Sequence, residues 1–268
     1  MPALTVTERL ELLRNIVRRP SINNYLPLIF KDFTEFHGDR YYGDDPAIIG
    51  GIALLGDTPV TIIAQDKGRD IEELKKTNFS MPHPEGYRKA LRLAKQAEKF
   101  RRPVICFVDT PGAFCGVDAE ERGQGEAIAR NLMEFMTLKT VVITIVLGEG
   151  GSGGALALGV CDELAMLENA LYSVISPRGF ASILWKDGSR EKEAAVLLKI
   201  SAEDLLRFGI CDRIIAEPEG GAHNDIPRTA ANISAYITEA VERLSALERQ
   251  TLPDRRYAKF RKIGSFTE

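Results

Sequence analysis

Two long apolar runs in the middle of this 268-residue chain restrict the folds that it can adopt. They are PVICFV at 103–108 and TVVITIVL at 140–147. Neither run alternates apolar with charged residues, which is typical of parallel strands that are covered on both faces. Helical patterns over 84–102 and 119–138 alternate with these runs. Together they predict an α/β fold with a mostly parallel core sheet.

Shorter elements are expected before and after this core. The segment 47–68 predicts two strands around the turn Gly56-Asp57, and 162–176 predicts two more. Thr5 and Glu8 have the spacing of a capping box for a first helix. A second helix is expected to follow it and to end near Gly38.

No repeat or low-complexity linker divides the chain, so we expect one domain over 1–268. Its helical N-terminal extension would cover 1–45 and its core 46–220. The remaining segment, 221–268, would hold a C-terminal helix and a basic tail that forms a surface arm. Two late helices are expected around 190–208 and 228–248.

Composition argues against several classes of function. The net charge is −3 and aromatic residues make up 7%, so neither a basic field nor a stacking surface points to nucleic acid. No apolar run approaches the roughly 18 residues of a membrane span, and no signal-peptide pattern opens the chain. We therefore expect a cytoplasmic protein without nucleic-acid or membrane partners. The four cysteines form no C-x-x-C pair, so no metal site is expected in this chain.

The second apolar run leads into GEGGSGGALALG at 148–159, which matches three patterns. Gly148, Gly150 and Gly153 fit a dinucleotide fingerprint, with Glu168 as the acidic residue. Ser152 fits a nucleophile elbow, with Asp212 and His223 as its partners. The third pattern is an oxyanion hole made of backbone N–H groups at a helix start.

The third pattern accounts best for the glycines. The helix after the turn is short for a dinucleotide crossover, and His223 lies in a polar loop. A backbone anion site needs N–H groups and no side chain, and a helix start favours negative charge. The turn DTPGA at 109–113 ends the preceding apolar strand in the same way, so the two turns should lie side by side.

Several long segments resemble the alpha subunits of bacterial acetyl-coenzyme A carboxylase carboxyltransferase. The strongest are VDTPGAFCGVDAEERGQGEAIARNL at 108–132, VLGEGGSGGALALGV at 146–160 and YSVISPRGFASILW at 172–185. Shorter matches are HGDR (37–40), AIIGGIA (47–53), DKGR (66–69), MPHPEGYRKALRL (81–93), EPEGGAH (217–223) and DRRY (254–257). The resemblance extends from about residue 25 and implies a crotonase-type (ClpP/crotonase-like) spiral of ββα units.

The resemblance also implies a reaction and its participants. The family transfers CO2 from carboxybiotin, held on a biotin carboxyl carrier protein, to acetyl-CoA, which gives malonyl-CoA for fatty acid biosynthesis. Biotin carboxylase uses ATP to carboxylate the biotin. A beta subunit with a zinc ribbon binds CoA, the alpha subunit serves the biotin side, and the two form an α2β2 heterotetramer.

By the same resemblance, Gly153 and Gly154 are the oxyanion-hole donors that stabilise charge on biotin. Gly150 and Gly151 shape the turn, and Gly112 and Ala113 line the biotin pocket. Glycine suits the turn because a Cβ would obstruct the ring or because φ is positive there. Gly154→Val is expected to abolish transfer without unfolding the chain.

Some features leave other interpretations open. Arg178 and Cys115 stand where the family has Glu and Pro, which affects the biotin-side contacts. A basic face formed by Arg88, Arg92, Lys95 and Lys99 is either a solvated surface or a site for CoA phosphate or an acidic partner. Two alternative functions are a stand-alone acyl-CoA hydratase or isomerase of the same fold, and a non-catalytic scaffold of the carboxylase complex.

Overall fold

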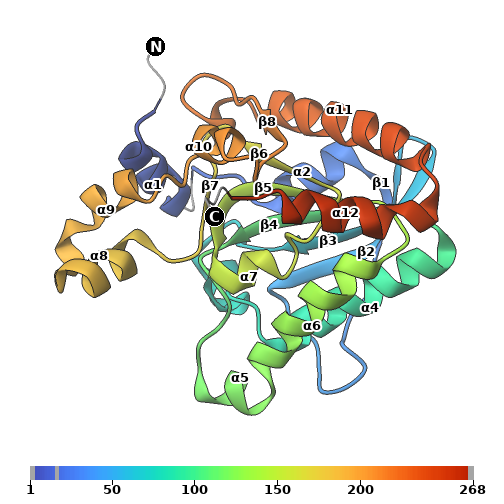
Figure 1. Ribbon diagram of the computed structural model, residues 1–268, viewed down its shortest axis with the longest axis horizontal. Helices are drawn as coiled ribbons and strands as arrows, with labels where there is room; N and C mark the ends of the chain where they lie inside the picture. Colours follow the sequence, from blue (N-terminus) through green and yellow to red (C-terminus); the bar gives the residue numbers. More distant parts are fainter. Residues whose placement is uncertain (1–3, 16–17, 265–268) are drawn as a thin grey trace, which may run out of the picture.

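One mixed sheet forms the centre of the molecule, in a computed structural model that describes residues 4–15 and 18–264 (Figure 1). Its strand order is β1-β2-β3-β4-β5-β6-β8, and β7 pairs with β5. The pairs from β3 to β8 are parallel, whereas β1, β2 and β3 pair antiparallel. The mostly parallel sheet expected from the apolar runs is confirmed. The strands are β1 (Lys31–Glu35), β2 (Ile48–Leu55), β3 (Thr58–Gln65), β4 (Val104–Thr110), β5 (Val142–Gly151), β6 (Glu163–Leu167), β7 (Leu171–Ser173) and β8 (Arg213–Ile215).

Helices cover both faces of this sheet (Figure 1). Helices α4 (Pro84–Phe100) and α6 (Gln124–Thr137) pack together on one face, and α2 (Ile22–Ile29) and α11 (Ile226–Ser245) on the other. The apolar stripe of α4, which is Tyr87, Leu91, Ala94 and Ala97, is buried. Burial on both faces explains why β4 is apolar along almost its whole length.

The remaining helices are short. Helices α8 (Pro177–Trp185) and α9 (Glu191–Leu197) project away from the sheet, at the left of Figure 1. The expected helix at 190–208 is two helices, α9 and α10, with a break between them that includes Ile200 and Ser201. The expected helix at 119–138 is also split, at Gly123, whose φ is +84°. The others are α3 (Ile71–Lys76), α5 (Val117–Glu121), α7 (Ser152–Leu156), α10 (Ala202–Arg207) and the 3-10 helices η1 (Asn78–Ser80), η2 (Gly188–Arg190), η3 (Ala222–Asn224) and η4 (Arg249–Thr251).

The first helix, α1 (Val6–Arg14), begins with the predicted capping box between Thr5 and Glu8. Its Arg9 forms two 2.6 Å hydrogen bonds with Glu203 of α10. After it, the buried Arg19 donates to Glu217 at 2.7 and 2.9 Å and to the Leu147 carbonyl in the middle of β5. These contacts attach the start of the chain to the core.

The expected second helix is much shorter than predicted. Helix α2 ends at Ile29, and Lys31–Glu35 forms β1, which pairs with β2. This segment pairs with an otherwise open sheet edge, and the stabilisation by this pairing outweighs the helix propensity of the segment. Gly51 permits this pairing, because a Cβ there would collide with the backbone of Thr34.

The basic tail is not a surface arm in its described part. It forms helix α12 (Leu252–Arg261), and Arg256 within it is fully buried. The Arg256 guanidinium donates to the carbonyls of Phe135, Met136, Leu138 and Thr140 and to Asp162. Because the last carbonyls of α6 lack partners within their own helix, the tail is held in place by satisfying them. Residues 265–268 lie outside the described part.

None of the helices in the described ranges is long and apolar enough to cross a membrane.

Candidate active site at two adjacent strand ends

The two turns singled out in the sequence lie next to each other, as predicted. Strands β4 and β5 are parallel neighbours, and Thr110 at the end of β4 is in register with Gly150. The chain leaves β4 through Pro111, Gly112 and Ala113, and it leaves β5 through Gly151 into α7. Both exits therefore lie at the same edge of the sheet, where parallel α/β folds bind ligands.

On one side the β5 turn is pressed against the β4 turn. A Cβ on Gly154 would lie 2.5 Å from the Ala113 nitrogen and 2.6 Å from the Gly112 carbonyl carbon. A Cβ on Gly151 would collide with the Pro111 carbonyl group. Glycine at these positions thus allows two backbones to approach closely.

Positive φ is not the reason for the glycines at 150–154. None of these four glycines has a positive φ, and the residue that does is Ser152, at +51°. The expectation that the glycine backbone is left-handed was wrong at these positions. Among the predicted pocket residues, Gly112 does have a positive φ, at +154°.

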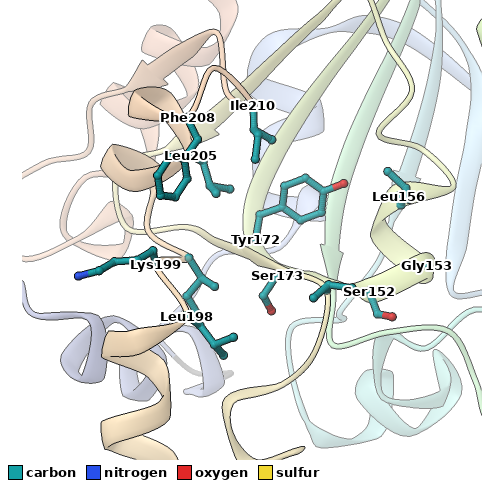
Figure 2. A pocket seen from close by; sticks show the side chains of 12 residues that line it. Ser152, Gly153, Leu156, Tyr172, Ser173, Leu198, Lys199, Leu205, Phe208 and Ile210 are labelled. Carbon is teal, nitrogen blue, oxygen red and sulfur yellow. The ribbon is translucent and has the colours of Figure 1, made fainter. Parts of the chain in front are cut away.

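On its other side the turn faces an open space. A Cβ on Gly153 would have its nearest neighbour, Ile128 Cγ2, at 3.6 Å. Gly153 borders a cavity of about 430 Å³, which we call the apolar cavity. Figure 2 shows its walls, which come from α7, β7 and the segment around α10: Leu156, Tyr172, Leu198, Leu205, Phe208 and Ile210.

Two N–H groups at this turn have no hydrogen-bond partner in the part of the chain that the structure describes. Gly153 and Gly154 belong to the first turn of α7, where a helix has no internal acceptors. Within the described ranges, no backbone carbonyl outside the helix accepts from either of them. Gly153 is half-buried and lines the apolar cavity, whereas Gly154 is buried and does not line it, and the role of both as donors to a ligand stays a prediction.

In the β4 turn, the two predicted pocket residues, Gly112 and Ala113, differ in their hydrogen bonding. The Gly112 N–H donates to Thr110 Oγ1 at 3.0 Å, so it is already used. No hydrogen bond is formed by the Ala113 N–H within the described residues, and this group lies beside Gly154.

A buried glutamine, Gln65, connects the two turns. Its Nε2 donates to the Gly154 carbonyl at 2.7 Å, and its Oε1 accepts from the Asp109 N–H at 3.2 Å. The Tyr87 hydroxyl also donates to the Gly154 carbonyl, at 3.4 Å. Sequence reasoning missed Gln65, although a polar residue at the end of the apolar run VTIIAQ was a usable signal.

A second cavity, of about 270 Å³, lies beside the turn, and we call it the charged cavity. Its lining includes Arg14, Lys67, Phe79, Pro111, Glu149, Gly150 and Gly151. Lys67 Nζ lies 2.9 Å from Glu149 Oε2 and 3.6 Å from Asp109 Oδ1. Burial alone would lower the pKa of Lys67, but these two carboxylates raise it above its ordinary value. The ammonium thus keeps its charge at neutral pH.

The two competing interpretations of the turn are not supported by this geometry. Asp212 binds the Leu164 N–H and Lys259, and His223 Nδ1 has no hydrogen-bond partner in the described residues, so these two do not form a triad with Ser152. In the dinucleotide pattern, Gly148 and Gly150 are packed against the side chains of Asp109 and Tyr172. Gly148 lines neither cavity, so a pyrophosphate has no access to it.

The basic face of α4 is used by the chain itself. Arg88 Nε donates to Asp39 at 2.7 Å, and Arg92 donates to the Gly38 carbonyl. Lys95 Nζ lies 2.9 Å from Glu134, and the Lys99 ammonium lies 5.8 Å from the centre of the Phe100 ring. These contacts favour a structural role for the face, since they hold the loop over 37–44 and join α4 to α6.

The two departures from the family pattern are exposed. Cys115 is a free thiol on the loop before α5, and it lines neither cavity. Arg178 lies on α8 next to Pro177, which does line the charged cavity. In the described ranges, no group of three or more His, Cys, Asp or Glu side chains is placed to hold a metal ion.

Comparison with known proteins gives a consistent result along the whole chain. A family model described as acetyl co-enzyme A carboxylase carboxyltransferase-like matches residues 1–264, which begins earlier than the resemblance noted from motifs. The chain is 58% identical over 265 residues to the acetyl-coenzyme A carboxylase carboxyl transferase subunit alpha of Clostridium acetobutylicum, covering 99% of this chain and 96% of that protein. A beta/alpha protein of Clostridium tetani is 54% identical over 258 residues, which are 96% of this chain and 45% of that longer protein.

Solved structures with the same fold are more distant in sequence. Transcarboxylase 12S aligns with a TM-score of 0.70 at 18% identity, over 91% of this chain and 46% of that one. The beta subunit of geranyl-CoA carboxylase from P. aeruginosa aligns with a TM-score of 0.66 at 14% identity, over 93% of this chain and 46% of that one. The expected crotonase-type fold is thereby confirmed. With the family model and the full-length relatives, it shows that the chain belongs to the family of acetyl-coenzyme A carboxylase carboxyl transferase alpha subunits.

Proposed function

We propose that this chain serves the biotin side of carboxyl transfer from carboxybiotin to acetyl-CoA, as a transferase that works together with a beta subunit. The observation that carries the proposal is the turn before α7. The N–H groups of Gly153 and Gly154 at this turn have no hydrogen-bond partner within the described residues, and Gly153 lines the apolar cavity.

A biotin ring fits the residues present at this turn. When bound, carboxybiotin would supply the CO2, and negative charge would develop on its ureido oxygen as the CO2 leaves, which would make biotin able to take the α-proton of acetyl-CoA. Gly153 and Gly154 would donate hydrogen bonds to that oxygen, and one such donor contributes roughly 3–4 kcal/mol in other enzymes. Gln65 would hold the turn in place, because it binds the Gly154 carbonyl. No side-chain base is required for these steps.

The partners form part of the proposal. The fused beta/alpha relative supports a beta subunit beside this chain. Exposed apolar side chains on α8, α9 and α10, next to the apolar cavity, provide a surface for it: Ile183, Leu184, Val196, Leu197, Leu206 and Phe208. We propose that the beta subunit covers this surface in an α2β2 heterotetramer, carries the zinc ribbon and binds CoA. The biotin carboxyl carrier protein would bring biotin, and ATP-dependent biotin carboxylase would recharge it.

A stand-alone acyl-CoA hydratase or isomerase is less favoured by the site. Such enzymes use carboxylates in their pocket. Among the described residues, no carboxylate lines the apolar cavity, and Glu149 in the charged cavity is paired with Lys67. A non-catalytic scaffold would not need the free N–H groups at Gly153 and Gly154.

Reconstitution tests the proposal. This chain is mixed with a zinc-ribbon beta subunit, and malonyl-CoA-dependent carboxylation of biocytin is measured, with each subunit alone as a control. Activity is expected for the pair and for neither subunit alone. A pair that assembles without transferring carboxyl groups, or hydration of enoyl-CoA by this chain alone, would overturn it.

A further inference from the structure

A left-handed turn at Asn78, Phe79 and Ser80 is the most strained segment of the described backbone. Their φ values are +51°, +57° and +60°, and none of them is glycine. A left-handed backbone brings the Cβ of such a residue too close to the following carbonyl oxygen. Strain of this kind persists where surrounding contacts impose it, and it is concentrated at functional sites.

Both ends of this turn are attached to the site described above. The buried Ser80 donates through its hydroxyl to the Asp109 carbonyl, and its own carbonyl accepts from Thr110 Oγ1 at 2.5 Å. That same hydroxyl oxygen of Thr110 accepts the Gly112 N–H. On the other end, the Asn78 amide and His83 Nδ1 share a hydrogen bond of 2.9 Å. The strained turn is therefore fixed to the end of β4.

The central side chain of the turn, Phe79, is stabilised little by packing against the core. It is 53% exposed and belongs to none of the hydrophobic clusters of the described core. Its ring instead lines the charged cavity, which the Cβ-free backbone of Gly150 and Gly151 also lines. An aromatic ring and a bare glycine backbone provide flat walls for a flat polar ring.

We propose that Phe79 is a binding residue for the fused ureido ring of biotin in the charged cavity. This inference rests on the proposed function. The ring would lie in the charged cavity beside Gly150 and Gly151, and, because Ser173 and Ile200 line both cavities, its ureido oxygen would face Gly153 where the two cavities adjoin. The left-handed turn keeps the Phe79 ring at the cavity wall before the ligand arrives.

The test compares Phe79→Ala with Phe79→Tyr in the complex with a beta subunit. In carboxylation of biocytin, Phe79→Ala is expected to raise KM for biocytin about tenfold, with kcat and KM for malonyl-CoA within about threefold, because the lost contact is made in the ground state. Phe79→Tyr retains the ring and is expected to behave like the unmodified chain.

Calorimetric binding of biocytin to the complex gives a readout that does not depend on transfer. The affinity of the Phe79→Ala complex should fall about tenfold, which corresponds to 1.4 kcal/mol. Phe100→Ala is the matched control, since Phe100 is 57% exposed at the end of α4 and lines neither cavity. Should Phe79→Ala not fold, Phe79→Leu gives the same comparison.

The outcomes separate the two proposals. Unchanged biocytin affinity and KM in Phe79→Ala would overturn the role of Phe79 while transfer by the unmodified pair upholds the proposed function. Equal losses toward biocytin and malonyl-CoA, together with a lower melting temperature, would reduce Phe79 to a structural residue. A pair without transfer whose biocytin binding still depends on Phe79 would refute the proposed function alone.

Discussion

The two sides of the turn after β5 are built in opposite ways. Toward β4, Gly151 and Gly154 have backbone atoms of Pro111, Gly112 and Ala113 where a Cβ would be. Toward the apolar cavity, Gly153 has room for one. On the crowded side, glycine thus allows two backbones to pack closely. On the open side, it leaves a backbone N–H donor accessible. The difference predicts that substitutions a single residue apart have unequal effects.

The largest effect is expected from Gly154→Ala. Its methyl group would displace the Gly112–Ala113 backbone, which should lower the free energy of unfolding by about 1–3 kcal/mol. Displacement of the N–H donors should reduce carboxyl transfer about 100-fold. Denaturant unfolding and the reconstituted assay measure the two losses. The earlier expectation that Gly154→Val spares folding therefore changes, because the structure adds a packing cost.

Substitution of Gln65, which bridges the two turns, should destabilise the crowded side without placing additional atoms between the two backbones. Gln65→Leu leaves the Gly154 carbonyl and the Asp109 N–H without their partner, which should cost about 1–3 kcal/mol of unfolding free energy. Transfer is expected to fall about tenfold because the donors lose their fixed position.

Tyr87→Phe is the matched variant, since it removes the longer 3.4 Å hydrogen bond to the same carbonyl. A larger loss from Tyr87→Phe than from Gln65→Leu would contradict the bridging role.

On the open side, the stability of the fold should depend on pH through Glu203 on α10. This residue lies close in sequence to Leu205, which lines the apolar cavity. The Arg9 hydrogen bonds lower the pKa of Glu203 from 4.5 to about 2. Because the pKa is lower in the folded state, this pair stabilises the fold above about pH 4.5 and loses its effect as the pH falls toward 2.

Unfolding free energies of the unmodified chain and of Glu203→Gln, measured from pH 6 to pH 2, check this direction. Their difference should shrink steadily below about pH 4.5. A difference that is constant with pH would show that the Arg9–Glu203 pair does not tie α1 to α10 in solution.

The smallest effect is expected from Gly153→Ala. The N–H donor is retained and the methyl group would meet Ile128 at an ordinary contact distance of 3.6 Å, so the free energy of unfolding should stay within about 1 kcal/mol, helped by the helix propensity of alanine. Transfer should remain within about threefold of the unmodified pair. If Gly153→Ala and Gly154→Ala lose equal stability in thermal melts, the two sides of the turn are not distinct.

Much of this arrangement followed from the sequence because its causes are local. The apolar runs marked β4 and β5, Thr5 and Glu8 marked the start of α1, and the parallel order placed DTPGA beside the glycine turn. The free donors at Gly153 and Gly154 were reached through the family resemblance, and their chemical role stays a prediction.

Contacts between distant segments could not be read in this way. Strand β1 forms because the open edge of β2 pairs with it, and the sequence KDFTE has no pattern that predicts this pairing. Gln65, Lys67 and Glu149 meet only after three strand ends converge, and the left-handed turn at Asn78–Ser80 is imposed by its hydrogen bonds to β4. One domain over 1–268, with the stated divisions, also remains a proposal, and a single cooperative unfolding transition would support it.

The buried Arg256 sets an order of events during synthesis. The carbonyls that it binds, from Phe135 to Thr140, leave the ribosome more than a hundred residues earlier than the arginine does. Until residue 256 emerges, the end of α6 and the start of β5 have water as their partner, and this part of the core stays incomplete. The nascent chain therefore reaches its final packing only after nearly the whole sequence has been translated. If the ribosome stalled before that point, the residues of the glycine turn would already be synthesised. The helix that carries Arg256 and packs beside α6 would still be missing.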